Sequence, residues 1–124
     1  MEPKILLYSM PKDIHKEIAA LCLKLGITCK KVPRGLFNQQ IGYHAQLQGF
    51  VKTKERYEGE DLAEPMMVFS GLDNALLDRF LDEYKKVGIK PVTLKAIATV
   101  HNVNWDTFIL FDNLCQERNT LDNK

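Results

Sequence analysis

Two stretches of the sequence decide the fold class, "EPKILLYSM" at residues 2–10 and "EPMMVFSGL" at residues 64–72. They align with an offset of 62, because residue 2 lies under residue 64. The same offset carries "LGI" at residues 25–27 onto "VGI" at residues 87–89, so no gap is needed between the two matches. A fixed internal offset is typical of a duplicated architecture. The sequence therefore predicts a chain built of two similar halves.

Each half shows the same succession of patterns. "KILLY" and "MMVF" are short, nearly continuous apolar runs, which are typical of strands covered on both faces. An amphipathic helical stretch follows each run and stops at Gly26 or Gly88, where a helix C-terminal glycine is expected. Asp73 is the predicted N-cap of the second of these helices. A further strand, "ITCKKV" or "KPVTLKAI", comes next, and a further helix ends each half.

This order predicts an α/β domain with duplicated βαβα halves and a four-stranded sheet that carries helices on both faces. The halves span about residues 2–51 and 64–118, and a charged linker at about 52–63 joins them. Residues 119–124 are predicted to be a frayed tail. The sequence leaves open whether the halves join in parallel or about an in-plane dyad, which would make the sheet mixed.

Composition restricts the class of protein. The 124 residues are 45% hydrophobic, and the formal net charge of +1 gives no general attraction to nucleic acid or to a membrane surface. The three cysteines follow no metal-binding spacing, and no stretch has the roughly 18 consecutive apolar residues of a membrane span. The start, "MEPKILLYSM", does not fit a signal peptide. We expect a cytoplasmic protein with one domain, outside the membrane and without a nucleic-acid partner.

The C-terminal half contains a series of short motifs. They are "PMMVFSG" at residues 65–71, Gly88-Ile89, "LKA" at residues 94–96, Asn102 and Trp105. On these motifs the sequence resembles the DUF3783 family, a bacterial domain of unknown function, and Gly42-Tyr43 extends the resemblance into the first half. The resemblance implies bacterial origin and carries over no chemistry. "TVHN" at residues 99–102 departs from the family pattern, so His101 is not promoted to a family-wide catalytic residue.

A ligand site is predicted where the strands end. Ligands of open parallel α/β sheets bind beyond the carboxyl ends of the strands. If the two halves are parallel, five residues share one rim; if they are antiparallel, the same residues divide between opposite edges. The residues of this predicted rim are Ser9, Arg34, Ser70, His101 and Asn102.

An enzyme is the alternative hypothesis. It would use His101 as a base or Lys95 as a nucleophile, with Arg34 holding an anion. A lone histidine is more often a surface residue, and a lysine in an apolar strand more often keeps its ammonium group in water. The three histidines form no recognised ligand spacing, so neither a metal nor a cofactor is predicted.

Two further clusters have a simple interpretation as well as a functional one. In "TVHNVNWDTF" at residues 99–108, Asn104 is the predicted N-cap of the last helix. The basic cluster in and near "CKKVPRG" could hold an anion, but a solvated strand edge protected by charge is the favoured interpretation. The members of that cluster are Lys24, Lys30, Lys31 and Arg34.

The favoured function is therefore that of a non-catalytic binding domain, for a protein partner or a small anionic ligand. Ser9, Arg34, Ser70 and Asn102 are its candidate ligand-binding residues. The two similar halves are also compatible with a homodimer in which one copy pairs with the other.

Overall fold

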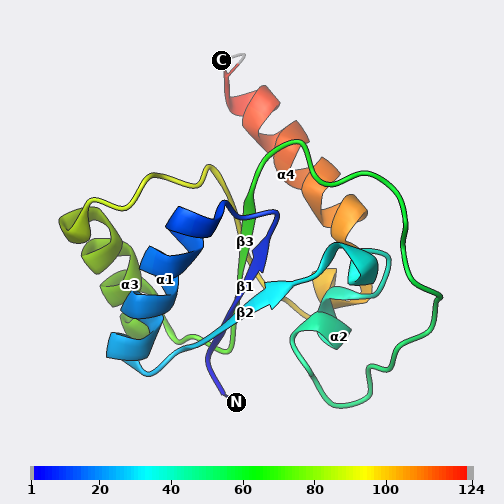
Figure 1. Cartoon of the computed structure of the whole chain (residues 1–124), viewed down its shortest axis with the longest axis horizontal. Coiled ribbons are helices and arrows are strands. Elements are labelled where there is room, and N and C mark those ends of the chain that lie inside the picture. Colours follow the sequence, from blue (N-terminus) through cyan, green and yellow to red (C-terminus); the bar gives the residue numbers. More distant parts are fainter. Residues whose placement is uncertain (1, 123–124) are drawn as a thin grey trace.

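The computed structural model describes residues 2–122 and shows a four-stranded sheet with helices on both faces (Figure 1). This confirms the predicted fold class. The elements are β1 (Lys4–Tyr8), α1 (Lys12–Leu25), β2 (Thr28–Val32), the 3₁₀ turn η1 (Arg34–Leu36), α2 (Ile41–His44), β3 (Met66–Ser70), α3 (Asn74–Val87), β4 (Leu94–Ile97), the 3₁₀ turn η2 (Asn102–Asn104) and α4 (Thr107–Asp122).

The sheet is mixed, with the strand order β2-β1-β3-β4. Within each half the two strands are parallel, whereas the central strands β1 and β3 are antiparallel, with Leu6 opposite Val68. Of the two arrangements that the sequence leaves open, the molecule adopts the one with opposed halves. Both halves follow the same order of elements, and their origin by duplication stays a prediction. As a consequence, β1 and β2 end at one end of the sheet, and β3 and β4 end at the other.

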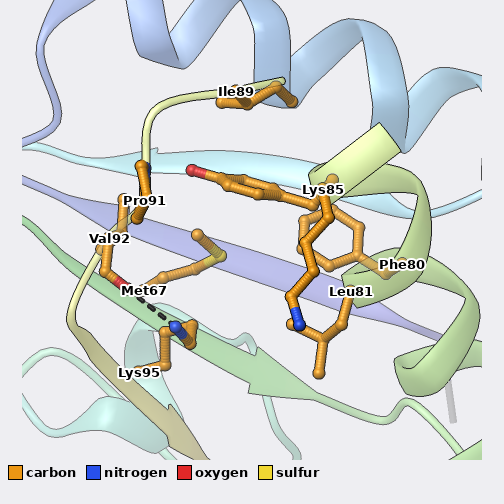
Figure 2. Close-up of a pocket in the computed structure, with 9 residues that line it drawn as sticks. Met67, Phe80, Leu81, Lys85, Ile89, Pro91, Val92 and Lys95 are labelled. Carbon is orange, nitrogen blue, oxygen red and sulfur yellow. Dashed lines mark hydrogen bonds between the residues drawn. The ribbon is translucent and has the colours of Figure 1, made fainter. Parts of the chain in front are cut away.

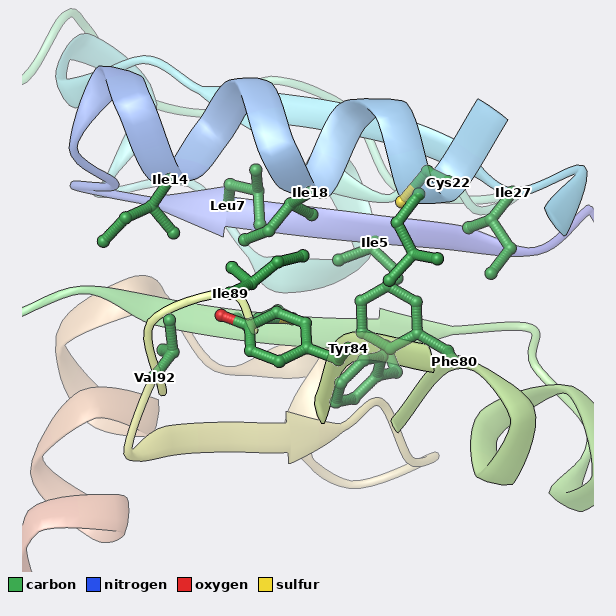
Figure 3. Close-up of a cluster of buried hydrophobic side chains, with 13 residues drawn as sticks. Ile5, Leu7, Ile14, Ile18, Cys22, Ile27, Phe80, Tyr84, Ile89 and Val92 are labelled. Atoms are coloured by element: carbon green, nitrogen blue, oxygen red, sulfur yellow. The ribbon is translucent and has the colours of Figure 1, made fainter. Parts of the chain in front are cut away.

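Alternation along β1 and β3 supplies two separate cores. Ile5 and Leu7 face α1 and α3, whereas Leu6 and Tyr8 face α2 and α4. Figure 3 shows the first core, in which Ile14 and Ile18 of α1 pack above the sheet and Phe80 and Tyr84 come from α3. Each side chain of this size contributes roughly 1.5–3 kcal/mol when it is fully buried. Every residue of both central strands is buried, as their continuous apolar runs predict.

The helix ends predicted at Gly26 and Gly88 and the N-cap predicted at Asp73 are confirmed. Gly26 and Gly88 take the left-handed conformation, with φ of 72° and 81°. The Asp73 carboxylate accepts a hydrogen bond from the backbone N–H of Leu76 at 2.8 Å, as expected of an N-cap.

The second helix of the first half is much shorter than predicted. We expect a helix over about residues 38–48, but α2 has only four residues. A Cβ atom at Gly42 would lie 2.7 Å from ring carbons of Phe50, so the chain folds back onto this helix where only glycine fits. Tertiary packing of the following turn therefore overrides the helical pattern.

The charged linker is attached to the domain instead of being freely solvated. The side-chain amide of the fully buried Gln39 donates to the Lys54 carbonyl at 2.8 Å and accepts from the Thr53 N–H at 2.9 Å. The Tyr57 ring packs against Phe108, with the ring centres 4.9 Å apart. We call residues 51–65 the strap, because this irregular segment is pinned along the α2 and α4 side.

Both ends of the last helix differ from the prediction. Asp106, and not Asn104, caps α4, since its carboxylate accepts from the N–H groups of Phe108 and Ile109 at 3.0 Å each. Asn104 instead ends η2 and donates to the Val100 carbonyl at 3.1 Å. The helix continues to Asp122, beyond the predicted end of the second half at residue 118, and fraying of this end stays a prediction. Residues 123 and 124 lie outside the described part of the chain.

Candidate functional site

The predicted rim at the strand ends does not form. Ser70, at the end of β3, pairs with Lys4 at the start of β1, so it lies at the opposite end of the sheet from Ser9. Arg34 follows β2 and therefore lies at the Ser9 end, whereas His101 follows β4 and lies at the Ser70 end. The antiparallel contact between β1 and β3 divides the five residues between two ends.

Two of the rim residues have structural partners, and a third is buried. The Ser9 hydroxyl hydrogen-bonds to the Asp61 carboxylate of the strap. Ser70 is buried at the end of β3. Asn102 is also buried, and its side chain closes the turn after β4 by accepting from the Thr99 N–H at 2.8 Å and donating to the Ile97 carbonyl at 2.9 Å. A ligand role for these side chains stays a prediction.

The residues of the enzyme hypothesis are not brought together. Because β2 and β4 are the two outer strands and end at opposite ends, Arg34 and His101 occupy opposite corners of the sheet. The His101 side chain is exposed, and it lines none of the three cavities described below. Lys95 is exposed on the outer strand β4. This agrees with the expectation of a lysine that keeps its ammonium group in water. Arg34 therefore does not meet Lys95 or His101, the other two residues of the enzyme hypothesis.

The most coherent candidate site is a cavity of about 280 Å³ between α3 and the β3–β4 side of the sheet (Figure 2). We call it the α3 pocket. Its walls are an aromatic and aliphatic face of α3, one side chain of β3, the segment before β4, and one side chain of β4. The lining residues are Met67, Phe80, Leu81, Tyr84, Lys85, Ile89, Pro91, Val92 and Lys95.

Local periodicity directs these side chains into the α3 pocket. Phe80, Leu81, Tyr84 and Lys85 recur at the spacing that places residues on one side of an α-helix. On β4, Leu94 and Ala96 point into the core under α4, so the intervening Lys95 points toward α3. The helical period of α3 and the alternation of β4 each place side chains on one face, and these two faces meet only in the folded protein.

Two ammonium groups make the α3 pocket basic. Lys95 Nζ donates to the Val92 carbonyl at 2.8 Å and retains two further hydrogens for a ligand. Figure 2 shows the nitrogen atoms of Lys85 and Lys95 at the same side of the pocket, with the Met67 side chain also lining it. No carboxylate lines the pocket, and within residues 2–122 neither lysine forms an ion pair.

Tyr84 supplies a neutral wall of the same pocket. Its hydroxyl donates to the Lys90 carbonyl at 2.6 Å. Burial raises the pKa of Tyr84 above its usual value, and the nearby Glu17 carboxylate raises it further. Tyr84 therefore stays protonated, and the lysines are the polar groups left to meet a ligand.

A buried polar pair lies on the other face of the sheet, where the sequence analysis assigned no function. The Tyr8 hydroxyl lies 2.8 Å from His44 Nδ1, and His44 Nε2 lies 2.6 Å from the Leu36 carbonyl oxygen. Because a carbonyl oxygen only accepts, Nε2 carries the hydrogen and Nδ1 accepts from Tyr8. A tyrosine in a buried central strand needs a hydrogen-bond partner for its hydroxyl. This requirement was the one feature of the sequence that could have indicated a buried polar group next to Tyr8.

Burial keeps the imidazole of this pair neutral. Desolvation lowers the pKa of His44 to about 4 and outweighs the opposing effect of the Leu36 carbonyl. The Lys30 ammonium lowers this pKa further, whereas Asp106 raises it. Burial also raises the pKa of Tyr8 well above its usual value. The pair therefore connects β1 to α2 as two neutral groups.

A second cavity, of about 270 Å³, lies beside β2 and α2. We call it the α2 cavity. His44 forms part of its wall, and lysines of the predicted basic cluster form another part. The lining residues are Lys30, Lys31, Val32, Pro33, Leu36, Tyr43, His44 and Gln46.

A third cavity, of about 360 Å³, lies between β4 and α4. It brings together Lys95 and Asn102, two of the predicted candidates, beside Trp105. Both Asn102 amide atoms already hydrogen-bond to the backbone. This cavity therefore offers fewer free polar groups than its residue types suggest.

The described chain shows neither a metal cluster nor a membrane helix. Among residues 2–122, no three histidine, cysteine, aspartate or glutamate side chains group as ligands for a metal ion. In the same range, every helix is too short or too polar to cross a membrane.

The fold and the α3 pocket define a small mixed α/β domain with a basic, mainly apolar cavity. Residues 65–121 match the model of the family described as a domain of unknown function, DUF3783. The chain resembles that family over this region, which confirms there the resemblance indicated by the sequence motifs. No curated protein and no solved structure shows a significant match to the chain.

Proposed function

We propose that this protein is a binding domain that takes up a small organic anion in the α3 pocket. The observation that carries the proposal is the pair of ammonium groups, of Lys85 and Lys95, on a cavity with mainly apolar walls. An apolar wall with a few well-placed polar groups is the usual composition of a small-molecule site. The ligand class is a monocarboxylate with an aromatic or branched body, whose charged end meets the lysines.

The size of the pocket supports a small ligand. Its volume of about 280 Å³ lies just below the range of roughly 300–1,000 Å³ that is usual for ligand pockets. The Phe80 and Tyr84 rings favour a planar apolar group, because aromatic rings stack or meet edge to face. The pocket is not complementary to a large or highly polar ligand.

Phenylacetate is a suitable probe, and phenylacetamide is its neutral counterpart. Binding is measured by chemical-shift changes of the Met67 and Val92 methyl groups during titration of the intact protein. We expect Lys95→Gln and Lys85→Gln each to weaken phenylacetate binding about tenfold, which corresponds to about 1.4 kcal/mol. This value is at the lower end for a hydrogen bond to a charged group, because both lysines are accessible to water.

Lys86→Gln is the matched control, because Lys86 is an exposed neighbour on α3 that does not line the pocket. It should bind phenylacetate as the unmodified protein does. Equal affinity for phenylacetate and phenylacetamide would contradict the proposal, and so would equal losses in the Lys86 and Lys95 variants. Association with a protein partner and pairing of two copies stay predictions from the sequence.

A further inference from the structure

Two cysteines lie where the end of α1 turns into β2. The Cys22 carbonyl accepts a hydrogen bond from the Ile27 N–H at 2.9 Å, and Ile27 is the residue just before β2. This bond ties the last turn of α1 to the start of the strand. Cys29, the second residue of β2, is therefore held near Cys22.

Both cysteine side chains point into the same layer of the domain. Cys22 belongs to the first core, between the sheet and the helices α1 and α3 (Figure 3). Cys29 pairs with Ile5 of β1, whose side chain faces that core, and it packs against the same core. Lys30, the next residue, points to the other face of the sheet, where its Nζ donates to the His44 carbonyl. Strand alternation thus places the Cys29 thiol on the α1 side.

The two thiols contact one another in this layer. A side-chain hydrogen bond joins Cys22 and Cys29. This bond raises the pKa of Cys22, and burial raises it further. The same bond lowers the pKa of Cys29, whereas the burial of Cys29 acts in the opposite direction. Because a thiol donor stabilises a thiolate acceptor, Cys29 is the sulfur that loses its proton first.

Exposure also distinguishes the two sulfurs. Cys22 is buried, whereas Cys29 is half-buried on β2, one of the two outer strands of the sheet. A small oxidant therefore reaches Cys29 before Cys22. Cys115 lies on α4 and packs against the second core, so the sheet separates it from the other two cysteines.

We propose that Cys29 and Cys22 are a peroxide-reactive thiol pair that closes a reversible disulfide bond within the chain. The Cys29 thiolate attacks one oxygen of hydrogen peroxide and the O–O bond breaks, so that Cys29 becomes a sulfenic acid. The hydroxide that leaves takes up the proton that Cys29 lost and becomes water. The Cys22 sulfur then forms the S–S bond, and the sulfenic hydroxyl leaves with the Cys22 proton as a second water.

The reaction balances without another reactant. The two sulfurs lose two electrons, and the peroxide gains them. A dithiol reductant reverses the reaction by thiol–disulfide exchange, because it takes over the S–S bond and returns both protons. The pair is separate from the α3 pocket, since neither cysteine lines that cavity.

The test treats the reduced, folded protein with hydrogen peroxide, unfolds it, and counts by mass spectrometry the thiols that iodoacetamide alkylates. We expect two of the three thiols to be lost. Peptide mapping should then join Cys22 to Cys29 in a monomeric chain, and dithiothreitol should restore all three thiols. Cys115→Ser is the matched control, because Cys115 lies on the other face of the sheet, and it should form the same disulfide.

Two variants establish the order of the two steps. In Cys22→Ser the Cys29 sulfenic acid has lost the thiol beside it, so it should accumulate and react with dimedone. In Cys29→Ser the buried Cys22 should stay reduced under the same treatment. A dimedone adduct on Cys22 in that variant would overturn the assignment of Cys29 as the attacking sulfur.

Three results with the unmodified protein would overturn the pair itself. The first is a disulfide between two chains. The second is oxidation of Cys115 as fast as that of Cys29. The third is retention of all three alkylatable thiols at a peroxide concentration that oxidises free cysteine. Binding of phenylacetate to the α3 pocket is a separate measurement, so the two proposals can fail independently.

Discussion

Mild acidification should destabilise this protein through His44. In the folded protein the imidazole is buried and neutral between the Tyr8 hydroxyl and the Leu36 carbonyl. Protonation would place a charge in the interior and a hydrogen on Nδ1, where the Tyr8 hydroxyl donates. The unfolded chain has no such restriction, so acid favours unfolding.

The sign and size of the effect follow from the two pKa values. His44 has a pKa of about 4 in the folded protein, against 6.5 for an unperturbed histidine. Because the folded value is the lower one, the stabilisation is complete above the unfolded pKa and is lost as the pH falls toward the folded pKa. The full difference corresponds to about 3 kcal/mol, and we expect about 2 kcal/mol of it to be lost between pH 7.5 and pH 5.

The assay is urea unfolding at these two pH values, followed by circular dichroism. In His44→Gln, which has no imidazole, the pH-dependent loss of unfolding free energy should shrink by about 2 kcal/mol, whatever the stability of the variant at neutral pH. His101→Gln removes an exposed histidine and should keep the full pH dependence. Arg118 lowers the pKa of Glu64, whose contribution is lost mainly below its usual pKa of 4.5 and so outside this window.

Equal losses of stability between the two pH values in the unmodified protein and in His44→Gln would refute this reasoning. That result would mean that the imidazole is protonated in the folded state without a penalty. The Tyr8 hydroxyl would then have to accept from the ring, and the proposed orientation of the pair would be wrong.

Two further predictions concern parts of the fold that the sequence analysis misjudged. Asp106→Ala should lower the free energy of unfolding by about 1 kcal/mol, as loss of an N-cap does, and Asn104→Ala should lower it less. Urea unfolding of both variants measures the two losses, and a larger loss in Asn104→Ala would contradict the observed cap. Gln39→Leu should destabilise the protein by about 1–3 kcal/mol, because it leaves backbone groups of the strap without partners. Hydrogen exchange should then accelerate at the Thr53 amide, and unchanged exchange there would show that Gln39 does not hold the strap.

The candidate sites were harder to predict than the fold. Lys95 was identified from sequence because a lysine in an apolar strand is conspicuous, but its companion Lys85 has the sequence appearance of an ordinary last-turn lysine. His44 is one of three histidines without a recognised ligand spacing, and its partner Tyr8 lies 36 residues away. Residues that meet across strands leave no local pattern, so spacing alone does not reveal them.

By itself, the sequence determined the fold class, the central strands and most of the ends of α1 and α3. These features depend on local physics, namely the burial of continuous apolar runs, the helical period of α1 and α3, and the left-handed freedom of Gly26 and Gly88. Only the tertiary structure decided that β1 and β3 run in opposite directions, because a linker of the observed length permits either direction and propensities do not encode it. That choice divided the predicted rim between two ends of the sheet. Only the tertiary structure also shows the α3 pocket, whose lining residues lie between Met67 and Lys95. The helical pattern and the strand pattern in this range do not indicate that their side chains meet.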